Sequence, residues 1–335
     1  MEKQIFFIDF EAVTVNYLNI HKSKLKDSVN YHKDLPYCYS IGTFKGGSYK
    51  NRFGIIRFKN ITYEKALIQL REKITKDIQT LIGDKEFIPV ASNCVFYGWG
   101  AGPENWIMEK LFKISVKKFS TIQVKLDNVV PDSIFSTSKY FENIKNIAKT
   151  IKHPVLSMIK QNTEDGRIAC WYGLAMLLDG RNIYHIDAKV KNQMHNDLRI
   201  YNLDDCKKLA FLYKNKFTAH KLIGKIFDIR REIQSLNAQI LTYDKYIEYL
   251  KSLTNEKNPP LLIKHDDIHK IKGSQEIPIE ILPSLRLSKK IWNDRVMRDL
   301  FLEQMIFIVN KRKEEIQTKK QELNEKILLQ RNNWY

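Results

Sequence analysis

The chain has 335 residues, 43% of them hydrophobic, which is enough to bury a core and to form one large domain or two smaller ones. Its formal net charge of +18 favours polyanionic partners, above all nucleic acid, although a lysine-rich composition also follows from an AT-biased genome. No apolar run reaches the ~20 residues of a membrane span, and acids interrupt the apolar segment near the N-terminus. We therefore expect a soluble cytoplasmic protein with no membrane contact, whose four scattered cysteines are reduced.

The first 216 residues alternate the patterns of strands and helices. A meander of three strands is predicted at Gln4–Phe10, Pro36–Phe44 and Arg52–Phe58. An amphipathic helix over Tyr63–Leu81 follows. Further strands are predicted at 87–99 and 119–129, and further helices at 104–112, 136–151, 168–178 and 198–216. This alternation predicts an α/β domain, a mixed sheet flanked by helices, over residues 1–216.

From residue 217 onward the pattern is that of long helices. Apolar residues recur at alternating steps of three and four, the spacing of a heptad seam: Ile226, Ile229, Ile233, Leu236, Ile240, Tyr243, Ile247 and Leu250. Asn258-Pro259-Pro260 ends this stretch, and a second helical stretch runs from about Lys289 to Leu329. We predict a basic helical arm over 217–335, an antiparallel hairpin or coiled coil with a short insert at about 258–285. Such an arm would clamp a substrate, bind a partner protein or pair with a second copy in a homodimer.

Two acidic side chains, Asp9 and Glu11, lie inside a stretch that otherwise has the pattern of a buried strand, "FFIDFEAV". Strand side chains alternate, so both acids project from one face while Ile8 and Phe10 pack the other. Two such acids raise each other's pKa unless a cation lies between them. Carboxylate oxygens select Mg²⁺ or Mn²⁺, and a pair of these ions is the standard device for phosphoryl displacement. The alternative is a solvated strand end without chemistry.

A second acidic motif, "RIYNLDDCKKL", lies in the helix predicted over 198–216. Tyr201 and Asp205 are one turn apart and share a face, while Asp204 is rotated by roughly 100°. Asp205 would then bind metal, and the Tyr201 phenol would orient an attacking water. The alternative is a helix with acids near its N-terminus, which the helix dipole favours.

Together the D-x-E strand and the later Y-x-x-x-D helix resemble the DEDD superfamily of 3′–5′ exonucleases, in its tyrosine subtype. The stretches "FIDFEAV" and "YNLDDC" are similar to the motifs of a bacterial and phage branch of ribonuclease H-like nucleases. The resemblance covers about residues 4 to 216. It implies a ribonuclease H-like fold, attack from the 3′ ends of single-stranded DNA or RNA, and a bacterial or phage-infected cytoplasm.

The family requires one more acid, at the start of a helix that follows a central strand. In this chain "VFYGWGAGPENWIMEKL" occupies that place, and Glu104 is the candidate. Most members carry Asp there, preceded by Asn and an aromatic residue, so this chain departs from the family pattern. Asp127 and Asp132 are the alternative acids, and Glu104 would otherwise be a first-turn charge that favours its helix.

The sequence thus predicts a two-metal nuclease. In this interpretation Asp9, Glu11, Glu104 and Asp205 bind two Mg²⁺ or Mn²⁺ ions, and Tyr201 orients the water. One alternative is a non-catalytic nucleic-acid-binding or scaffold protein on the same fold. Others are a ribonuclease or endonuclease with the same site, and a coiled-coil adaptor in which only the arm has a function.

Overall fold

The computed structural model describes residues 3–25, 30–135, 140–254, 294–332 and 334. It divides the chain into two compact units, Met1–Lys221 and Leu222–Tyr335. The predicted domain boundary, after residue 216, lies at the start of helix α8 (Lys216–Thr254), which continues into the second unit. The predicted insert at about 258–285 lies outside the described residues. Where the structure describes helices, none is both long and apolar enough to cross a bilayer.

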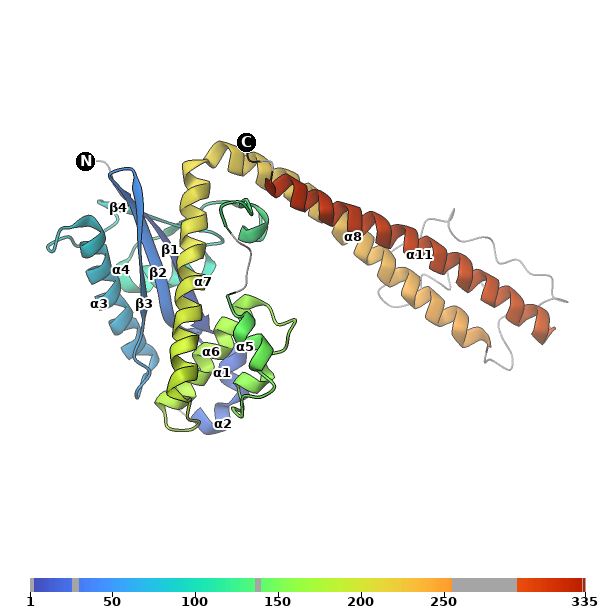
Figure 1. The fold of residues 1–335 in the computed structure, drawn as a ribbon, viewed down its shortest axis with the longest axis horizontal. Helices are drawn as coiled ribbons and strands as arrows, with labels where there is room; N and C mark the ends of the chain where they lie inside the picture. Colours follow the sequence, from blue (N-terminus) through green and yellow to red (C-terminus); the bar gives the residue numbers. More distant parts are fainter. Residues whose placement is uncertain (1–2, 26–29, 136–139, 255–293, 333, 335) are drawn as a thin grey trace. The chain divides into compact units, whose positions relative to one another are not determined.

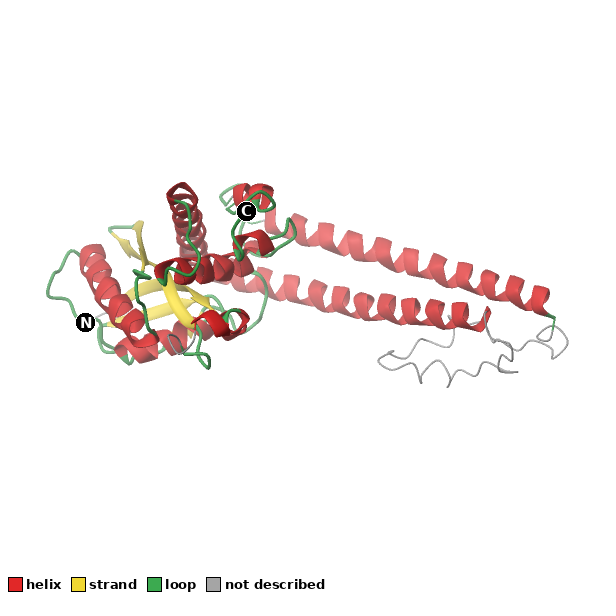
Figure 2. Ribbon diagram, turned by 90° about the horizontal axis from the view of Figure 1, so that it is seen from below, coloured by secondary structure: helices red, strands yellow, loops and turns green. Residues whose placement is uncertain are grey.

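The first unit is an α/β structure around a five-stranded mixed sheet (Figures 1 and 2). Its order is β3-β2-β1-β4-β5, with β1 (Gln4–Val13), β2 (Leu35–Lys45), β3 (Ser48–Ile55), β4 (Cys94–Gly98) and β5 (Val116–Lys118). The first three strands form the predicted antiparallel meander, and β4 runs parallel to both β1 and β5. Gly46 and Gly47, both with positive φ, make the two-residue turn between β2 and β3.

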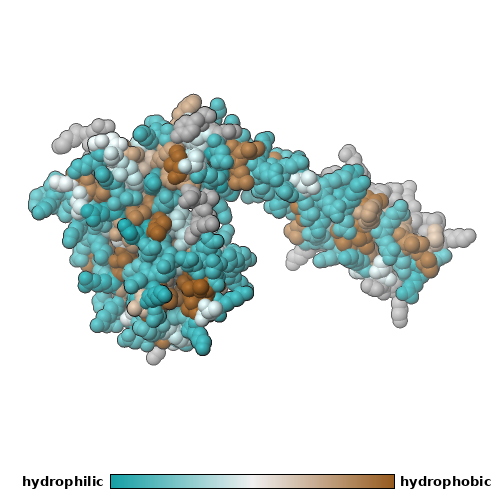
Figure 3. Space-filling view, viewed as in Figure 1, coloured by the Kyte–Doolittle hydropathy of each residue, from teal (hydrophilic) through white to brown (hydrophobic). Residues whose placement is uncertain are grey.

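Helices cover both faces of this sheet. They are α1 (Val15–Ile20), α2 (Lys22–Leu25), α3 (Tyr63–Ile82), α4 (Gly102–Phe112), α5 (Glu142–Ile147), α6 (Asp165–Gly180) and α7 (Ala188–Lys214). Helices α3 and α7 lie on opposite sides of the strands (Figure 1). The predicted apolar stripe of α3 is buried at Ala66, Leu70, Ile74 and Ile78. Figure 3 shows hydrophilic residues over most of the viewed surface, with apolar patches between them.

The prediction of a strand over 119–129 is wrong. The chain leaves the sheet after β5, and a single 3-10 turn, Leu126–Asn128, follows. The Phe119 ring stacks against Trp99 with ring centroids 5.8 Å apart, and the Trp99 indole N–H donates to the Val124 carbonyl at 2.9 Å. These contacts hold the segment as a loop over the end of β4, because its apolar residues find partners outside the sheet.

The second unit contains a helical hairpin. The part of α8 from Leu222 onward packs along α11 (Arg295–Asn332) through a shared apolar core: Tyr243, Tyr246, Ile247, Leu250, Leu253, Leu302, Met305 and Val309. Ion pairs join Asp244 to Lys313 at 2.5 Å and Glu232 to Lys319 at 2.8 Å. The earlier residue of α8 pairs with the later residue of α11, so the two helices are antiparallel.

Candidate active site

Strand β1 presents Asp9 and Glu11 on the face of the sheet that α7 covers. The alternation is as predicted, since Ile8 and Phe10 are buried on the opposite face. β1 lies between β2 and β4, which places the two acids near the middle of the sheet. The register with β2 shifts directly after Glu11, and such bulges re-aim neighbouring side chains. Both acids remain partly exposed, so solvent reaches them.

Hydrogen bonds fix α7 against these strands. The Asn202 side-chain amide donates to the Asp9 carboxylate at 2.5 Å. Ser40, which pairs with Asp9 across the β1–β2 ladder, donates its hydroxyl to the Asn202 carbonyl at 2.6 Å. The Cys206 thiol donates to the carbonyls of Phe7 and Ser40. Asn202 and Cys206 are one turn apart on the sheet-facing side of α7, so the helix holds one rotational setting above Asp9.

Glu104 lies in the first turn of α4, as predicted. Gly98, at the end of β4, lets this turn come close: a Cβ added there would lie 3.3 Å from the Glu104 side chain and from Ala101. Burial raises the pKa of Glu104, while hydrogen bonds from its own backbone N–H and from that of Phe10 lower it. Because Phe10 lies between Asp9 and Glu11 in β1, this contact ties Glu104 to the acid-bearing strand.

The structure brings the four predicted acids into electrostatic contact. Burial raises the pKa of Asp9 well above its usual value, and the other three acids raise it further, whereas Lys208 lowers it. The pKa of Glu11 is raised in the same way, by burial first and then by Asp205 and Glu104. Burial raises the pKa of Asp205 to about 7, against the lowering effect of Lys208. We call Asp9, Glu11, Glu104 and Asp205 the acid cluster.

Lys208 is a member of the site that the sequence interpretation missed. Its side chain is 1% exposed, and its ammonium lies 2.7 Å from Asp127, 3.1 Å from Asp204 and 3.1 Å from Asp205. The Tyr140 hydroxyl is 2.9 Å from the same nitrogen and also donates to Asp204. The spacing does contain a signal, since Lys208 stands three and four residues after two acids on a predicted helix.

Tyr201 lies beside the acid cluster. Burial raises the pKa of its phenol well above 10, and the negative charges of Glu11, Asp205 and Asp9 raise it further. Its ring packs on Tyr140 and Phe141, with centroids 5.4 and 5.3 Å away. The phenol therefore keeps its proton and can donate a hydrogen bond beside the cluster.

The two alternative acids of the second motif have different places. Asp127 contacts Lys208, so it borders the site through that ammonium, and its side chain is 41% exposed. Asp132 is exposed. Neither is among the groups that shift the pKa of Asp9 or Glu11, whereas Glu104 is. Of the three candidates, the structure places Glu104 nearest in electrostatic terms to the strand acids.

The donor chemistry of the cluster fits a hard divalent cation. All four groups are carboxylates, the ligands that Mg²⁺ and Mn²⁺ prefer. Burial is the main cause that raises the pKa values of Asp9, Glu11 and Asp205, and neighbouring carboxylates raise them further. In the part of the chain that the structure describes, no three His, Cys, Asp or Glu side chains are arranged as a group that could hold a metal ion. The donors fit such an ion in kind and in charge.

The chain matches no protein-family model, no curated protein and no solved structure.

Proposed function

We propose that the protein is a metal-dependent 3′–5′ exonuclease that hydrolyses phosphodiester bonds of single-stranded DNA or RNA. One observation carries the proposal: β1, α4 and α7 bring carboxyl groups that are up to 196 positions apart in the sequence to one partly open site, where burial and then Glu11, Asp205 and Glu104 raise the pKa of Asp9. Clusters of acids with perturbed pKa values are concentrated at functional sites. The mixed sheet agrees with the ribonuclease H-like fold that the sequence resemblance implies.

Asp9, Glu11, Glu104 and Asp205 would hold two Mg²⁺ or Mn²⁺ ions, which supply charge neutralisation at the phosphate and a water that is easily deprotonated. The chain's own groups position the reactants. The Tyr201 phenol, which keeps its proton, donates a hydrogen bond that orients the water. Asn202 fixes one oxygen of Asp9, and Lys208 fixes Asp205 at 3.1 Å.

The 3′ polarity follows from the family resemblance alone. The net charge of +18 favours an anionic polymer as substrate. We further infer that the helical hairpin winds as a coiled coil and acts as a substrate clamp or a partner-docking arm. The cytoplasm of a bacterium or of a phage-infected cell is the proposed location.

The test is hydrolysis of single-stranded DNA and RNA labelled at the 5′ end, with Mg²⁺, with Mn²⁺ and with EDTA. We expect a ladder that shortens from the 3′ end in wild type with either ion, and no product with EDTA or with Asp9→Asn. Glu86→Gln, an exposed acid in the loop after α3, is the matched control and should cleave as wild type does. Inert wild-type protein on both polymers with both ions would refute the proposal.

End dependence is tested separately. A substrate with a blocked 3′ end, and a circular single strand, should resist an exonuclease and be cut by an endonuclease or ribonuclease that uses the same site. Cleavage of the circle would keep the acid cluster catalytic and replace the exonuclease by an endonuclease.

A second candidate function is a nucleic-acid-binding or scaffold protein without catalysis. It is favoured by one observation, that no three acidic, Cys or His side chains among the described residues form a group that could hold a metal. In that case the polymer should bind with EDTA, and neither ion should produce cleavage.

A further inference from the structure

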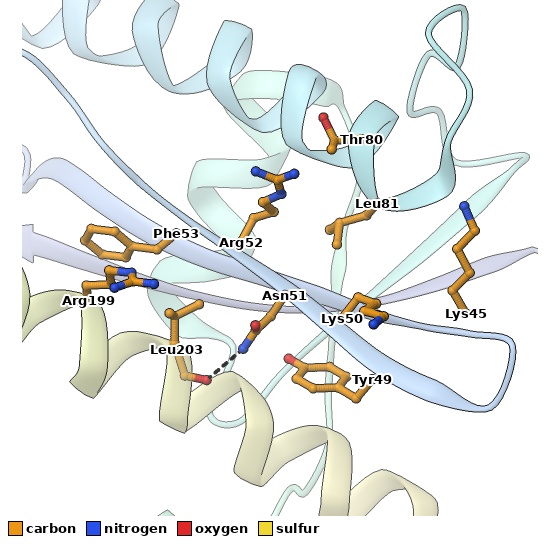
Figure 4. Close-up of a pocket in the computed structure, with 10 residues that line it drawn as sticks. All are labelled: Lys45, Tyr49, Lys50, Asn51, Arg52, Phe53, Thr80, Leu81, Arg199 and Leu203. Carbon is orange, nitrogen blue, oxygen red and sulfur yellow. Dashed lines mark hydrogen bonds between the residues drawn. The ribbon is translucent and has the colours of Figure 1, made fainter.

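A hollow of about 670 Å³ lies at the free edge of β3, away from the acid cluster (Figure 4). Residues from β3, from the end of β2, from α3 and from α7 line it: Lys45, Tyr49, Lys50, Asn51, Arg52, Phe53, Thr80, Leu81, Arg199 and Leu203. None of the four clustered acids is among them. On α7, Arg199 and Leu203 lie roughly 200° around the helix axis from Tyr201 and Asp205, on the opposite flank. We call this hollow the β3-edge site.

The charge of the β3-edge site is of one sign. Four of its lining residues are cations, Lys45, Lys50, Arg52 and Arg199, and none is acidic. The Lys45 ammonium donates to the Ile82 carbonyl at the end of α3, at 2.7 Å. Among the described residues, none of these four cations has a carboxylate within ion-pair distance. Arg52 acts electrostatically on Asp77 of α3: burial raises the pKa of Asp77, and Arg52 is one of the groups that lower it.

The cations lie on both faces of the edge strand β3. Lys50 and Arg52 project from the face of β3 toward α3, whereas Arg199 comes from α7 on the other face. Lysine and arginine on an edge strand commonly prevent pairing with another sheet. That role accounts for Lys50 and Arg52, and it does not account for Arg199, which a separate element contributes to the same hollow.

The cations are also spread along the strand. Figure 4 shows Arg199 beside Phe53 at one end and Lys45 beside Lys50 at the other, with Arg52 between them. Lys50 and Arg52 are alternate residues of β3, so they are roughly 6.7 Å apart along the strand. Cations next to an aromatic ring, here the partly exposed Phe53, suit a single strand, because the cations can bind its phosphates and the ring can stack on a base.

We infer that the β3-edge site binds backbone phosphates of a single-stranded nucleic acid, at nucleotides remote from the scissile bond. This inference rests on the proposed function for its choice of polymer. Because the site is separate from the acid cluster, it contributes affinity for long strands and leaves the hydrolysis of a dinucleotide unchanged.

The test is binding, measured with EDTA so that hydrolysis does not interfere. Fluorescence anisotropy measures the affinity of wild type, of Lys50→Gln/Arg52→Gln and of Arg199→Gln for a labelled single strand. The strand has roughly 20 nucleotides, because the single-strand binding site of one small domain covers ~4–16. The matched control is Arg57→Gln/Lys59→Gln, which removes two exposed cations just beyond β3. Thermal melting of each variant shows that it is folded.

We expect the double variant to weaken binding about tenfold or more and to reduce the slope of log affinity against log salt by about 1.4, since each phosphate contact to a single strand contributes roughly 0.7. Arg199→Gln should reduce the slope by about 0.7. Affinities of both within twofold of wild type, or an equal loss in the control, would overturn the inference. The inference would also be overturned if pyrophosphate displaced the strand and bound with the same affinity as the strand, because the site would then bind a small phosphorylated ligand.

The inference about the β3-edge site and the nuclease proposal can fail independently of each other. If wild type binds the strand through the β3-edge site and cleaves nothing with Mg²⁺ or Mn²⁺, the nuclease proposal fails and the β3-edge site stands. If wild type cleaves and the double variant binds as wild type does, the nuclease proposal stands and the β3-edge site fails.

Discussion

Replacing Lys208 by methionine tests the electrostatics of the site directly. The buried ammonium contacts three carboxylates, those of Asp127, Asp204 and Asp205, at 2.7, 3.1 and 3.1 Å. Methionine keeps most of the apolar stem and removes the charge, so like charges would face each other without a counter-ion. Breaking a buried ion pair by removing one partner costs roughly 3–5 kcal/mol. We expect the free energy of unfolding of Lys208→Met to fall by about that amount at pH 8.

The assay is urea unfolding with EDTA present, at pH 8 and at pH 5. Because the pKa of Asp205 is about 7, Asp205 is largely protonated at pH 5, and Lys208 then has one charged partner fewer. The loss should therefore be smaller at pH 5. For a unit of about 220 residues, the loss at pH 8 corresponds to a fall in melting temperature of roughly 6–20 °C.

Lys207→Met is the control, because Lys207 is exposed. Its ammonium makes a cation–π contact with the Phe135 ring, 5.6 Å from the ring centroid. Exposed substitutions of this type change the free energy of unfolding by no more than about 0.5 kcal/mol. A loss below about 1 kcal/mol for Lys208→Met at both pH values would refute the assignment of Lys208 as the internal counter-ion. Lys208→Met should also reduce nuclease activity, because Asp205 would lose the contact that fixes it.

Three further results are expected. With EDTA, the free energy of unfolding of wild type relative to Asp205→Asn should fall by up to about 4 kcal/mol as the pH rises from 4 to 7. The reason is that folded Asp205 keeps its proton to about pH 7, whereas unfolded Asp205 loses it near its ordinary pKa of 3.8. A difference in urea unfolding that stays constant with pH would contradict this. Asp9→Asn should lower cleavage about a thousandfold, equivalent to several kcal/mol of transition-state stabilisation, without lowering the melting temperature in EDTA, and Mg²⁺ should raise that temperature in wild type alone. Leu250→Ala, in the core of the hairpin, should cost about 2–5 kcal/mol by urea unfolding monitored by circular dichroism, with strand cleavage per folded molecule kept.

The parts of the fold that the sequence predicted are those that local patterns determine. Period-two alternation placed Asp9 and Glu11 on one face of β1, and helical spacing placed Tyr201 and Asp205 together on α7. The helix predicted over 198–216 begins ten residues earlier in the structure, at Ala188 of α7. In the structure Asp197 is buried and accepts a hydrogen bond from the Tyr172 hydroxyl, and the cap is Asp187, ten residues earlier.

The residues that the sequence did not predict depend on tertiary contacts. Lys207 and Lys208 are adjacent and chemically identical, yet one is exposed and the other is 1% exposed at the side chain. The difference arises from Asp127 and Tyr140, which loops far away in the sequence bring to Lys208. The β3-edge site was missed for a similar reason: it combines Arg52 with Arg199, 147 positions later, across the edge of the sheet.

The charge distribution of the chain separates binding of the polymer from its hydrolysis. An acid cluster repels a phosphodiester, and with EDTA present Lys208 is its one described internal counter-ion, already shared with Asp127 and Asp204. Any affinity for the strand under those conditions must therefore come from cations elsewhere. The net charge of +18 provides long-range attraction, but it does not determine where on the surface the polymer binds. The salt slope and the Lys50→Gln/Arg52→Gln variant locate that attraction, because only cations in contact with phosphate release counter-ions when the strand binds. Addition of Mg²⁺ should then increase affinity in wild type more than in Asp9→Asn, since neutralising the cluster removes repulsion that Asp9 helps to create.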